Sequence, residues 1–191
     1  MIILTGPSAS GKTATCLYLQ AHYGIKKVIT HTTREMRKGE KNDVDYHFVS
    51  KEEFEKMKEN NEFIETVSFN GNFYGTSRKE VQLDKCMAVE FNGAKTYASF
   101  HDPKIVIFYM KANEKLRLSR MYGRGDDPEK IKSRIDNDHK AFELDDSIYR
   151  IIDVEVDTEK YDISHAADFI YHRYFEILKE RGVDISQVKN S

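Results

Sequence analysis

The chain has 191 residues, of which 39% are hydrophobic and 32% are charged, as is typical of one globular domain with a polar surface. Its 30 basic and 32 acidic side chains leave a net charge of −2, which argues against a nucleic acid duplex as partner. No stretch is long and apolar enough for a membrane span, and no charged leader precedes an apolar segment at the N-terminus. We therefore expect a cytoplasmic protein that binds neither nucleic acid nor membrane.

The hydrophobic pattern predicts strands that alternate with helices along most of the chain. Strands are expected at 2–4, 27–30, 46–49, 63–69, 72–76, 86–91, 104–110 and 148–156. Helices are expected at 14–23, 51 to about 60, 77–83, 94–102, 114–122, 129–144 and 163–181. Ser50 with Glu53 fits a helix capping box, and Asn70-Gly71 is a strong hairpin turn signal.

This alternation predicts an α/β fold with a mostly parallel sheet flanked by helices, whose ligands bind at the carboxyl ends of the strands. Residues 31 to about 80 differ, because short strands and a hairpin signal there indicate a small, mostly antiparallel lobe inserted into the core. The two cysteines, Cys16 and Cys86, lack the spacing of a metal site, so we expect buried thiols in a reducing compartment.

A phosphate-binding loop follows the first predicted strand. The pattern G-x-x-x-x-G-K-[ST] is matched by Gly6, Pro7, Ser8, Ala9, Ser10, Gly11, Lys12 and Thr13. The glycines allow successive N–H groups to face an anion, and the helix that follows adds its positive N-terminal end. Lys12 can reach the β- and γ-phosphates, and the Thr13 hydroxyl can bind Mg²⁺. The strand before the loop and the helix after it support an ATP site over a chance match.

Two further groups of residues suit a phosphorylated acceptor. Guanidinium and phenol groups that fit a phosphate monoester occur at Arg34, Arg37, Tyr46 and Tyr74, although a solvated charged loop is an equally good interpretation of these residues alone. Glu65 lies in a hydrophobic strand, where a carboxylate can accept two N–H groups from guanine. Taken alone, it fits a surface glutamate better.

A third group lies around a glycine-flanked loop and contains Arg120, Arg124 and Arg134. Arginines on a closing lid stabilise the charge that spreads over the oxygens of a transferring phosphoryl group, and they exclude water. Solvated charges on a pair of helices are the alternative interpretation. The phosphate-binding loop favours the lid.

Taken together, these motifs resemble those of the guanylate kinase family, which phosphorylates GMP with ATP. The resemblance is close from residue 4 to about 80 and is limited to separate motifs after that. It rests on residues 6–13, Thr30-His31-Thr32-Thr33-Arg34, Arg37, Gly39, Glu40, Asp45-Tyr46, Phe48, 61–65, 71–77, Asn92-Gly93, Arg120, Gly123-Arg124-Gly125 and Arg134. Because several independent motifs occur in the same order, the resemblance is specific.

The resemblance implies a fold with a P-loop NTPase core, an inserted mixed α+β GMP-binding lobe and a short helical lid. The corresponding boundaries are 1–30, 81–117 and 146–191 for the core, 31–80 for the lobe and 118–145 for the lid. It also implies ATP and Mg²⁺ as cofactors, with Thr13 at the metal. Lys12, Arg120, Arg124 and Arg134 would be catalytic. GMP would be bound by Thr30, Arg34, Arg37, Tyr46, Glu65, Tyr74, Thr76 and Glu90.

Within this assignment, Glu65 would read guanine N1–H and the 2-amino group, with the hydroxyls of Thr76 and Thr30 near O6. The family usually has serine at the place of Thr30, and the hydroxyl is retained. Two acids one residue apart are usual at the end of the strand near residue 88. Here the first is Ala88 and only Glu90 is acidic, which affects the water around Mg²⁺.

The usual Val-Asn-Asp near adenine is Val156-Asp157-Thr158 in this chain, so the adenine contacts stay open. Two alternative functions also stay open: a kinase of the same fold with another phosphorylated acceptor, and a catalytically weak binding module. The complete phosphate loop and Glu65 with Thr76 favour phosphorylation of GMP, and of dGMP, to GDP or its deoxy form. The sequence leaves a monomer and a homodimer equally open.

Overall fold

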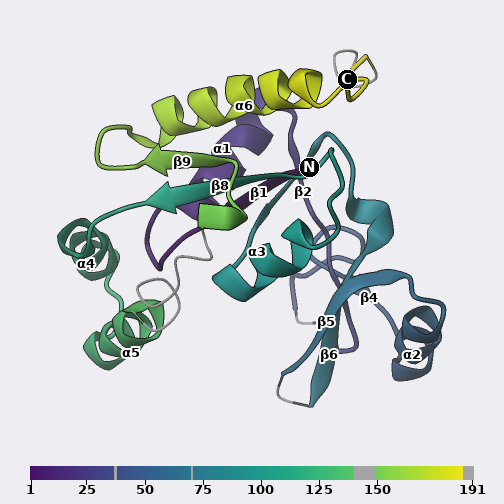
Figure 1. Cartoon of the computed structure of the whole chain (residues 1–191). Helices are drawn as coiled ribbons and strands as arrows, with labels where there is room; N and C mark the ends of the chain where they lie inside the picture. The colour runs from purple at the N-terminus through teal and green to yellow at the C-terminus, as the bar shows by residue number, and fades with distance from the viewer. Residues whose placement is uncertain (37, 70, 140–148, 187–191) are drawn as a thin grey trace.

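The computed structural model describes residues 1–36, 38–69, 71–139 and 149–186. Its core is a sheet of five parallel strands in the order β2-β7-β1-β8-β9 (Figure 1). These strands are β1 (Ile2–Thr5), β2 (Lys26–Lys27), β7 (Lys85–Ala88), β8 (Val106–Lys111) and β9 (Val154–Asp157). Because all five run the same way, their carboxyl ends lie at one edge of the sheet, where the loop after β1 begins.

Helices cover both faces of this sheet. The helices α1 (Lys12–Tyr23) and α6 (Ile163–Glu180) lie on one face, and α3 (Phe91–Ala98) lies on the other (Figure 1). Successive side chains of a strand point to opposite faces, so Ile2 and Leu4 pack in the cluster with Ile170 of α6, whereas Ile3 packs with Tyr97 of α3. The continuous apolar run of β1 is explained by burial on both faces.

A second, mixed sheet of four strands has the order β4-β3-β6-β5. It contains β3 (His31–Thr32), β4 (His47–Phe48), β5 (Phe63–Phe69) and β6 (Asn72–Ser77). The hairpin of β5 and β6 is antiparallel, as the Asn70-Gly71 turn signal predicts, and β3 pairs in parallel with β4. Helix α2 (Lys51–Glu59) covers this sheet, and Phe54 stacks on Phe63 with ring centroids 4.5 Å apart. The capping box predicted from Ser50 and Glu53 is formed.

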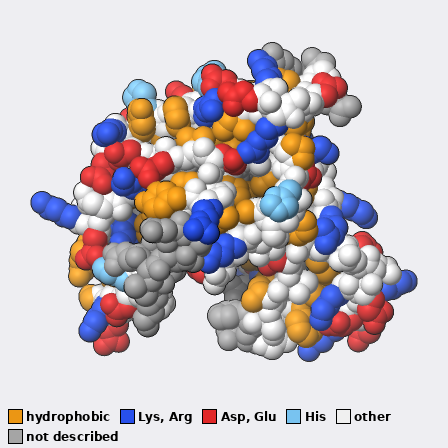
Figure 2. All heavy atoms as spheres, in the orientation of Figure 1, with side chains coloured by type: hydrophobic (Ala, Val, Ile, Leu, Met, Phe, Trp, Pro, Cys, Tyr) orange, Lys and Arg blue, Asp and Glu red, His pale blue; other side chains and the backbone are white. Residues whose placement is uncertain are grey.

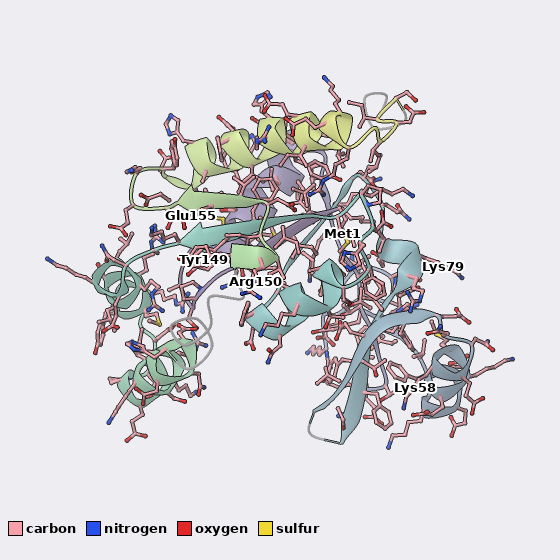
Figure 3. All side chains as sticks on the ribbon, viewed as in Figure 1. Met1, Lys58, Lys79, Tyr149, Arg150 and Glu155 are labelled. Carbon is pink, nitrogen blue, oxygen red and sulfur yellow. The ribbon has the colours of Figure 1, made fainter. Side chains whose placement is uncertain are left out.

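Two helices, α4 (Glu114–Gly123) and α5 (Pro128–Asp138), project from the core on the side away from the second sheet (Figure 1). They pack together through Met121, Ile131 and Ile135. The space-filling view shows the molecule hollowed between this helix pair and the second sheet (Figure 2). Figure 3 places Met1 at the amino end of the parallel sheet and Lys58 on α2, at the outer part of the second sheet's lobe.

Several predicted elements differ from those observed. The helix expected at 77–83 is wrong: only a 3₁₀ turn, η1 (Arg78–Glu80), forms there, because Ser77 still pairs with Phe63 in the hairpin and β7 begins soon after. The strand expected at 27–30 ends at Lys27, and the N–H of Ile29 is bound by the Glu80 side chain instead of a strand.

Other boundaries shift. The strand expected at 86–91 ends at Ala88, and α3 begins at 91 instead of 94, because Glu90 is the N-cap of that helix. The strand expected at 148–156 begins only at Val154, after a short helical turn at 149–151. Helix α5 ends at Asp138, and 140–144 of the longer helix predicted there lie outside the described residues, as does Asn70 of the hairpin turn.

Cys16 and Cys86 are free thiols whose sulfur atoms are 2.9 Å apart. Cys86 is buried in the core and Cys16 is half-buried on α1, so the prediction of a buried pair is confirmed for Cys86 and only in part for Cys16. Across the described ranges, none of the helices combines the length and apolarity needed to cross a membrane.

Candidate active site

The phosphate-binding loop begins at the carboxyl end of β1. Gly6 has φ of 143°, and a Cβ atom there would lie 2.5 Å from the Met110 carbonyl oxygen of β8. Only glycine therefore lets the loop turn this close to the neighbouring strand. Gly11 has φ of 102° and is the N-cap of α1, so the loop ends directly at a positive helix terminus.

Lys12 folds back over this loop. Its Nζ donates to the carbonyl oxygens of Gly6, at 2.6 Å, and Pro7, at 2.8 Å. Burial of the amine lowers the pKa of Lys12 to about 8, against the opposing effects of the nearby carboxylates Asp138 and Glu90. The amine thus lies directly at the loop, as its assigned role in binding phosphate requires.

Arg120 extends from α4 to the same loop. Its guanidinium donates to the Ala9 carbonyl oxygen at 3.1 Å and to the hydroxyl and carbonyl oxygens of Thr158 at 3.2 and 3.1 Å. Thr158 follows β9 and is buried. The structure therefore brings together Lys12 and Arg120, which are 108 positions apart by their residue numbers.

Arg124 and Arg134 lie further out, on the α4–α5 pair. Both bind the carboxylate of Asp126, at 2.6 and 3.1 Å, and both side chains are about half exposed. Within the described part of the chain, the side-chain hydrogen bonds of both arginines go to Asp126 and not to the loop. The structure groups these two arginines with each other, and not with Lys12.

The sequence analysis missed an ion pair that touches the loop. The Arg117 guanidinium lies 2.6 Å from an Asp138 carboxylate oxygen, and these residues are 5% and 9% exposed. Asp138 also accepts the Ser8 N–H at 2.9 Å and the Ser8 hydroxyl at 3.2 Å. The available signal was spacing: Asp138 follows the buried Ile131 and Ile135 by seven and three positions and therefore shares their face of α5.

The second sheet holds the residues predicted to bind the acceptor phosphate. The Arg34 guanidinium lies 5.4 Å from the Tyr46 ring centroid, and the rings of Tyr46 and Tyr74 are 6.1 Å apart. Glu40 binds Arg34 at 2.7 Å and raises its pKa. The structure thus brings three of the four predicted residues together, and Arg37 lies outside the described residues.

The predicted base-reading pair is also assembled. Glu65 and Thr76 are direct partners across β5 and β6, and the Thr76 hydroxyl donates to a Glu65 carboxylate oxygen at 2.8 Å. Thr76 is fully buried and Glu65 is half-buried. Thr30 directly precedes β3, and its carbonyl oxygen accepts the His47 N–H at 2.9 Å.

The metal prediction concerns Thr13, in the first turn of α1, and the end of β7. Both Thr13 and Glu90 are exposed, and the Glu90 side chain makes no cap bond to α3. No group of three or more potential His, Cys, Asp or Glu ligands occurs among the described residues. A single hydroxyl with one carboxylate nevertheless fits Mg²⁺, which keeps several waters and relies on substrate phosphates.

Comparisons with known proteins agree with this geometry. The family model described as guanylate kinase matches residues 1–171. The guanylate kinase of Fusobacterium nucleatum is 31% identical over 159 residues, covering 80% of this chain and 86% of that protein. The guanylate kinase of Thiobacillus denitrificans is 35% identical over 143 residues, covering 71% and 68% of the two chains.

The solved guanylate kinase of Anaplasma phagocytophilum has the same fold. It superimposes with a TM-score of 0.57 at 24% identity, covering 97% of this chain and 87% of that one. The predicted α/β fold, with its parallel sheet and second mixed sheet, is therefore confirmed. So are the resemblance and the enzyme class, because the chain belongs to the guanylate kinase family.

Proposed function

We propose that this chain transfers the γ-phosphoryl group of ATP to GMP, yielding ADP and GDP. The observation that carries the proposal is the convergence of Lys12 and Arg120 on one phosphate-binding loop, in a chain of the guanylate kinase family. A positive pair at such a loop stabilises the charge of a transferring phosphoryl group.

On the donor side, the N–H groups of the loop and the N-terminus of α1 hold the phosphates of ATP. Lys12 releases its two carbonyl partners and binds the β- and γ-phosphates instead, since a charged phosphate oxygen is a stronger acceptor than a carbonyl. Arg120 is held by Thr158 at the other side of the loop. We assign adenosine to the surface beside this side of the loop, near Thr158 and Tyr161, which together with Arg120 line a hollow too small to hold the base itself.

On the acceptor side, Arg34, Tyr46 and Tyr74 hold the phosphate of GMP, together with Arg37. Glu65 accepts N1–H and the 2-amino group of guanine, and Thr76 fixes the carboxylate while lying near O6. Thr30 completes this end of the site. Because Glu40 already binds Arg34, the GMP phosphate must share or replace that ion pair.

The reaction is an in-line displacement. An oxygen of the GMP phosphate forms a bond to the γ-phosphorus as the bond to the bridging oxygen of ADP breaks, and no covalent enzyme intermediate is needed. Lys12 and Arg120 bind the developing charge. Arg124 and Arg134, on the helices α4 and α5 that we propose as a lid, approach when this lid closes over the GMP-binding lobe and excludes water.

Mg²⁺, when bound, neutralises charge between the β- and γ-phosphates. In this proposal Thr13 would hold the metal directly, and Glu90 would orient water or the acceptor beside it. Ala88 supplies no oxygen, so the metal relies on fewer protein groups. The free thiols of Cys16 and Cys86 and the small-molecule substrates support a cytoplasmic location.

The test is ADP release from ATP and Mg²⁺ with GMP, dGMP, AMP, CMP, UMP or no acceptor. We expect turnover with GMP and dGMP alone. Turnover with a different acceptor would keep the kinase chemistry but contradict the role of Glu65. A protein that binds ATP yet leaves every acceptor unchanged would be a binding module.

A further inference from the structure

An aspartate of helix α5 occupies part of the phosphate-binding loop. One Asp138 oxygen accepts the Ser8 N–H at 2.9 Å, and the other accepts the Ser8 hydroxyl at 3.2 Å. Ser8 is the third residue of the loop whose N–H groups are arranged for an anion. The carboxylate is therefore an anion bound to that loop, supplied by the chain itself.

One cation binds the carboxylate directly, and a second lies near it. Arg117 of α4 binds it at 2.6 Å in a nearly fully buried ion pair. Lys12 is close enough for Asp138 to oppose the effect of burial on its pKa. A negative group, the loop N–H and two positive groups thus form one site, and an incoming phosphate would meet the same donors.

We infer that Asp138 is an internal competitor of the ATP phosphates, and that its displacement couples ATP binding to movement of α5. The inference rests on the proposed function, because it requires the loop to bind ATP. Two anions cannot share Ser8 N–H and the neighbouring positive groups without strong repulsion, so ATP enters as the carboxylate leaves. Asp138 is the last residue of α5, so its departure releases the contact that holds this helix against the loop.

A purely structural ion pair predicts something different. If Arg117 and Asp138 only joined α4 to α5, removing the carboxylate would lower stability and leave ATP affinity unchanged. Competition predicts that removing the carboxylate strengthens ATP binding even while stability falls. ATP affinity, measured alongside stability, therefore distinguishes competition from a purely structural ion pair.

The experiment measures ATP binding by calorimetry for the wild type, Asp138→Asn and Asp136→Asn. Asp136 is an exposed acid on the same helix, so its variant removes the same charge without touching the loop. We expect Kd for ATP to fall about tenfold in Asp138→Asn, the scale of one hydrogen bond to a charged group. The Asp136→Asn variant should bind ATP like the wild type.

Hydrogen exchange of α5 supplies the second readout. In the absence of nucleotide, Asp138→Asn should exchange faster at residues 128–138 than the wild type, and ATP should speed exchange there in the wild type alone. Unchanged or weaker ATP binding by a folded Asp138→Asn variant would overturn the inference.

A neutral pair, Arg117→Gln with Asp138→Asn, covers the case in which the single variant does not fold, because it leaves no buried charge without a partner. It keeps the net charge, but Arg117 itself can attract an incoming phosphate, so the double variant is compared with Arg117→Gln alone. We expect it to bind ATP more tightly than that single variant; equal or weaker binding overturns the inference. If the wild type itself fails to bind ATP, the proposed function is wrong. In that case the hydrogen-exchange rates of α5 still test the inference: if they are the same in Asp138→Asn and the wild type, the Asp138 contact does not hold α5 against the loop.

Discussion

The Thr76 hydroxyl donates a 2.8 Å hydrogen bond to Glu65, its direct partner across the β5–β6 hairpin. One carboxylate oxygen is thereby fixed from a fully buried position, while Glu65 itself stays half-buried. A carboxylate held in this way presents its acceptor atoms to a planar base in one orientation. The first prediction follows from this contact.

Glu65→Gln should reduce kcat/KM for GMP and leave KM for ATP unchanged. The amide oxygen keeps the Thr76 bond, which turns the amide NH₂ toward the N–H groups of guanine. We expect a loss of roughly 2 kcal/mol or more, because buried donors then face each other. Steady-state kinetics with each substrate varied in turn measures it, with Glu59→Gln on the exposed face of α2 as the matched control. An unaltered kcat/KM for GMP would disprove the base-reading role.

Lys12 should make catalysis sensitive to alkaline pH. Burial lowers its pKa from the usual 10.5 to about 8, and only the protonated amine attracts phosphate. We therefore expect kcat/KM for ATP to fall as pH rises through about 8, since this parameter reports the free enzyme. Lys12→Arg should lose that alkaline limb whatever its absolute rate, because guanidinium stays protonated. If kcat/KM for ATP of Lys12→Arg falls at the same pH as that of the wild type, the alkaline limb arises from another group.

The same shift predicts the direction of a stability change. Between the lowered pKa of about 8 and the usual 10.5, the unfolded chain binds more protons at Lys12 than the folded chain. The contribution of Lys12 to the free energy of unfolding therefore increases with pH across that window. Urea unfolding of the wild type and Lys12→Met gives the free energy of unfolding at several pH values. The difference between the two slopes of this free energy against pH is the contribution of Lys12. Parallel slopes would contradict the lowered pKa.

Ala88→Asp should lower the Mg²⁺ concentration needed for half-maximal rate. Ala88 is the last residue of β7, opposite Leu4 of β1, so an acid there lies at the strand end next to the loop. Its oxygens would add a second carboxylate beside Glu90 to orient water around the proposed Mg²⁺. Titration of Mg²⁺ at fixed ATP and GMP measures the change, and Ala88→Asn controls for side-chain size. Identical titrations of all three proteins would mean that Glu90 with Thr13 suffices.

Gly6→Ala should abolish ATP binding and cost more stability than Gly24→Ala. Both glycines have positive φ, but a Cβ at Gly6 would meet the Met110 carbonyl oxygen at 2.5 Å, whereas nothing lies within 4 Å of one at Gly24. Gly24→Ala is thus a control for backbone strain alone, about 1 kcal/mol. Thermal unfolding and ATP calorimetry of both variants measure the difference. Equal losses of stability, with ATP binding retained, would remove the steric argument.

Local physics explains what the sequence by itself determined. The glycines, Lys12 and Thr13 of the loop occur in one short stretch, and so do the capping groups of Ser50 and Glu53, so neighbouring residues were enough to predict both. The hydrophobic pattern likewise predicted β1, β5 and β6, because successive side chains of a strand point to opposite faces and their polarity shows which faces are buried. The family membership followed from such local motifs in order.

Only the tertiary structure decided which distant groups meet. Ser8 and Asp138 are separated by 130 positions, and no local pattern tells a buried aspartate of a charged helix from a solvated one. The position of Arg120 depends on Thr158 in the same way. Strand pairing also prevailed over local helix propensity at 77–83, where a 3₁₀ turn replaces the expected helix. The segment between the end of β6 and the start of β7 is too short for a full helix. Contacts between residues far apart in the sequence therefore determine which side chains bind the phosphate loop. Their energies cannot be read from any one segment.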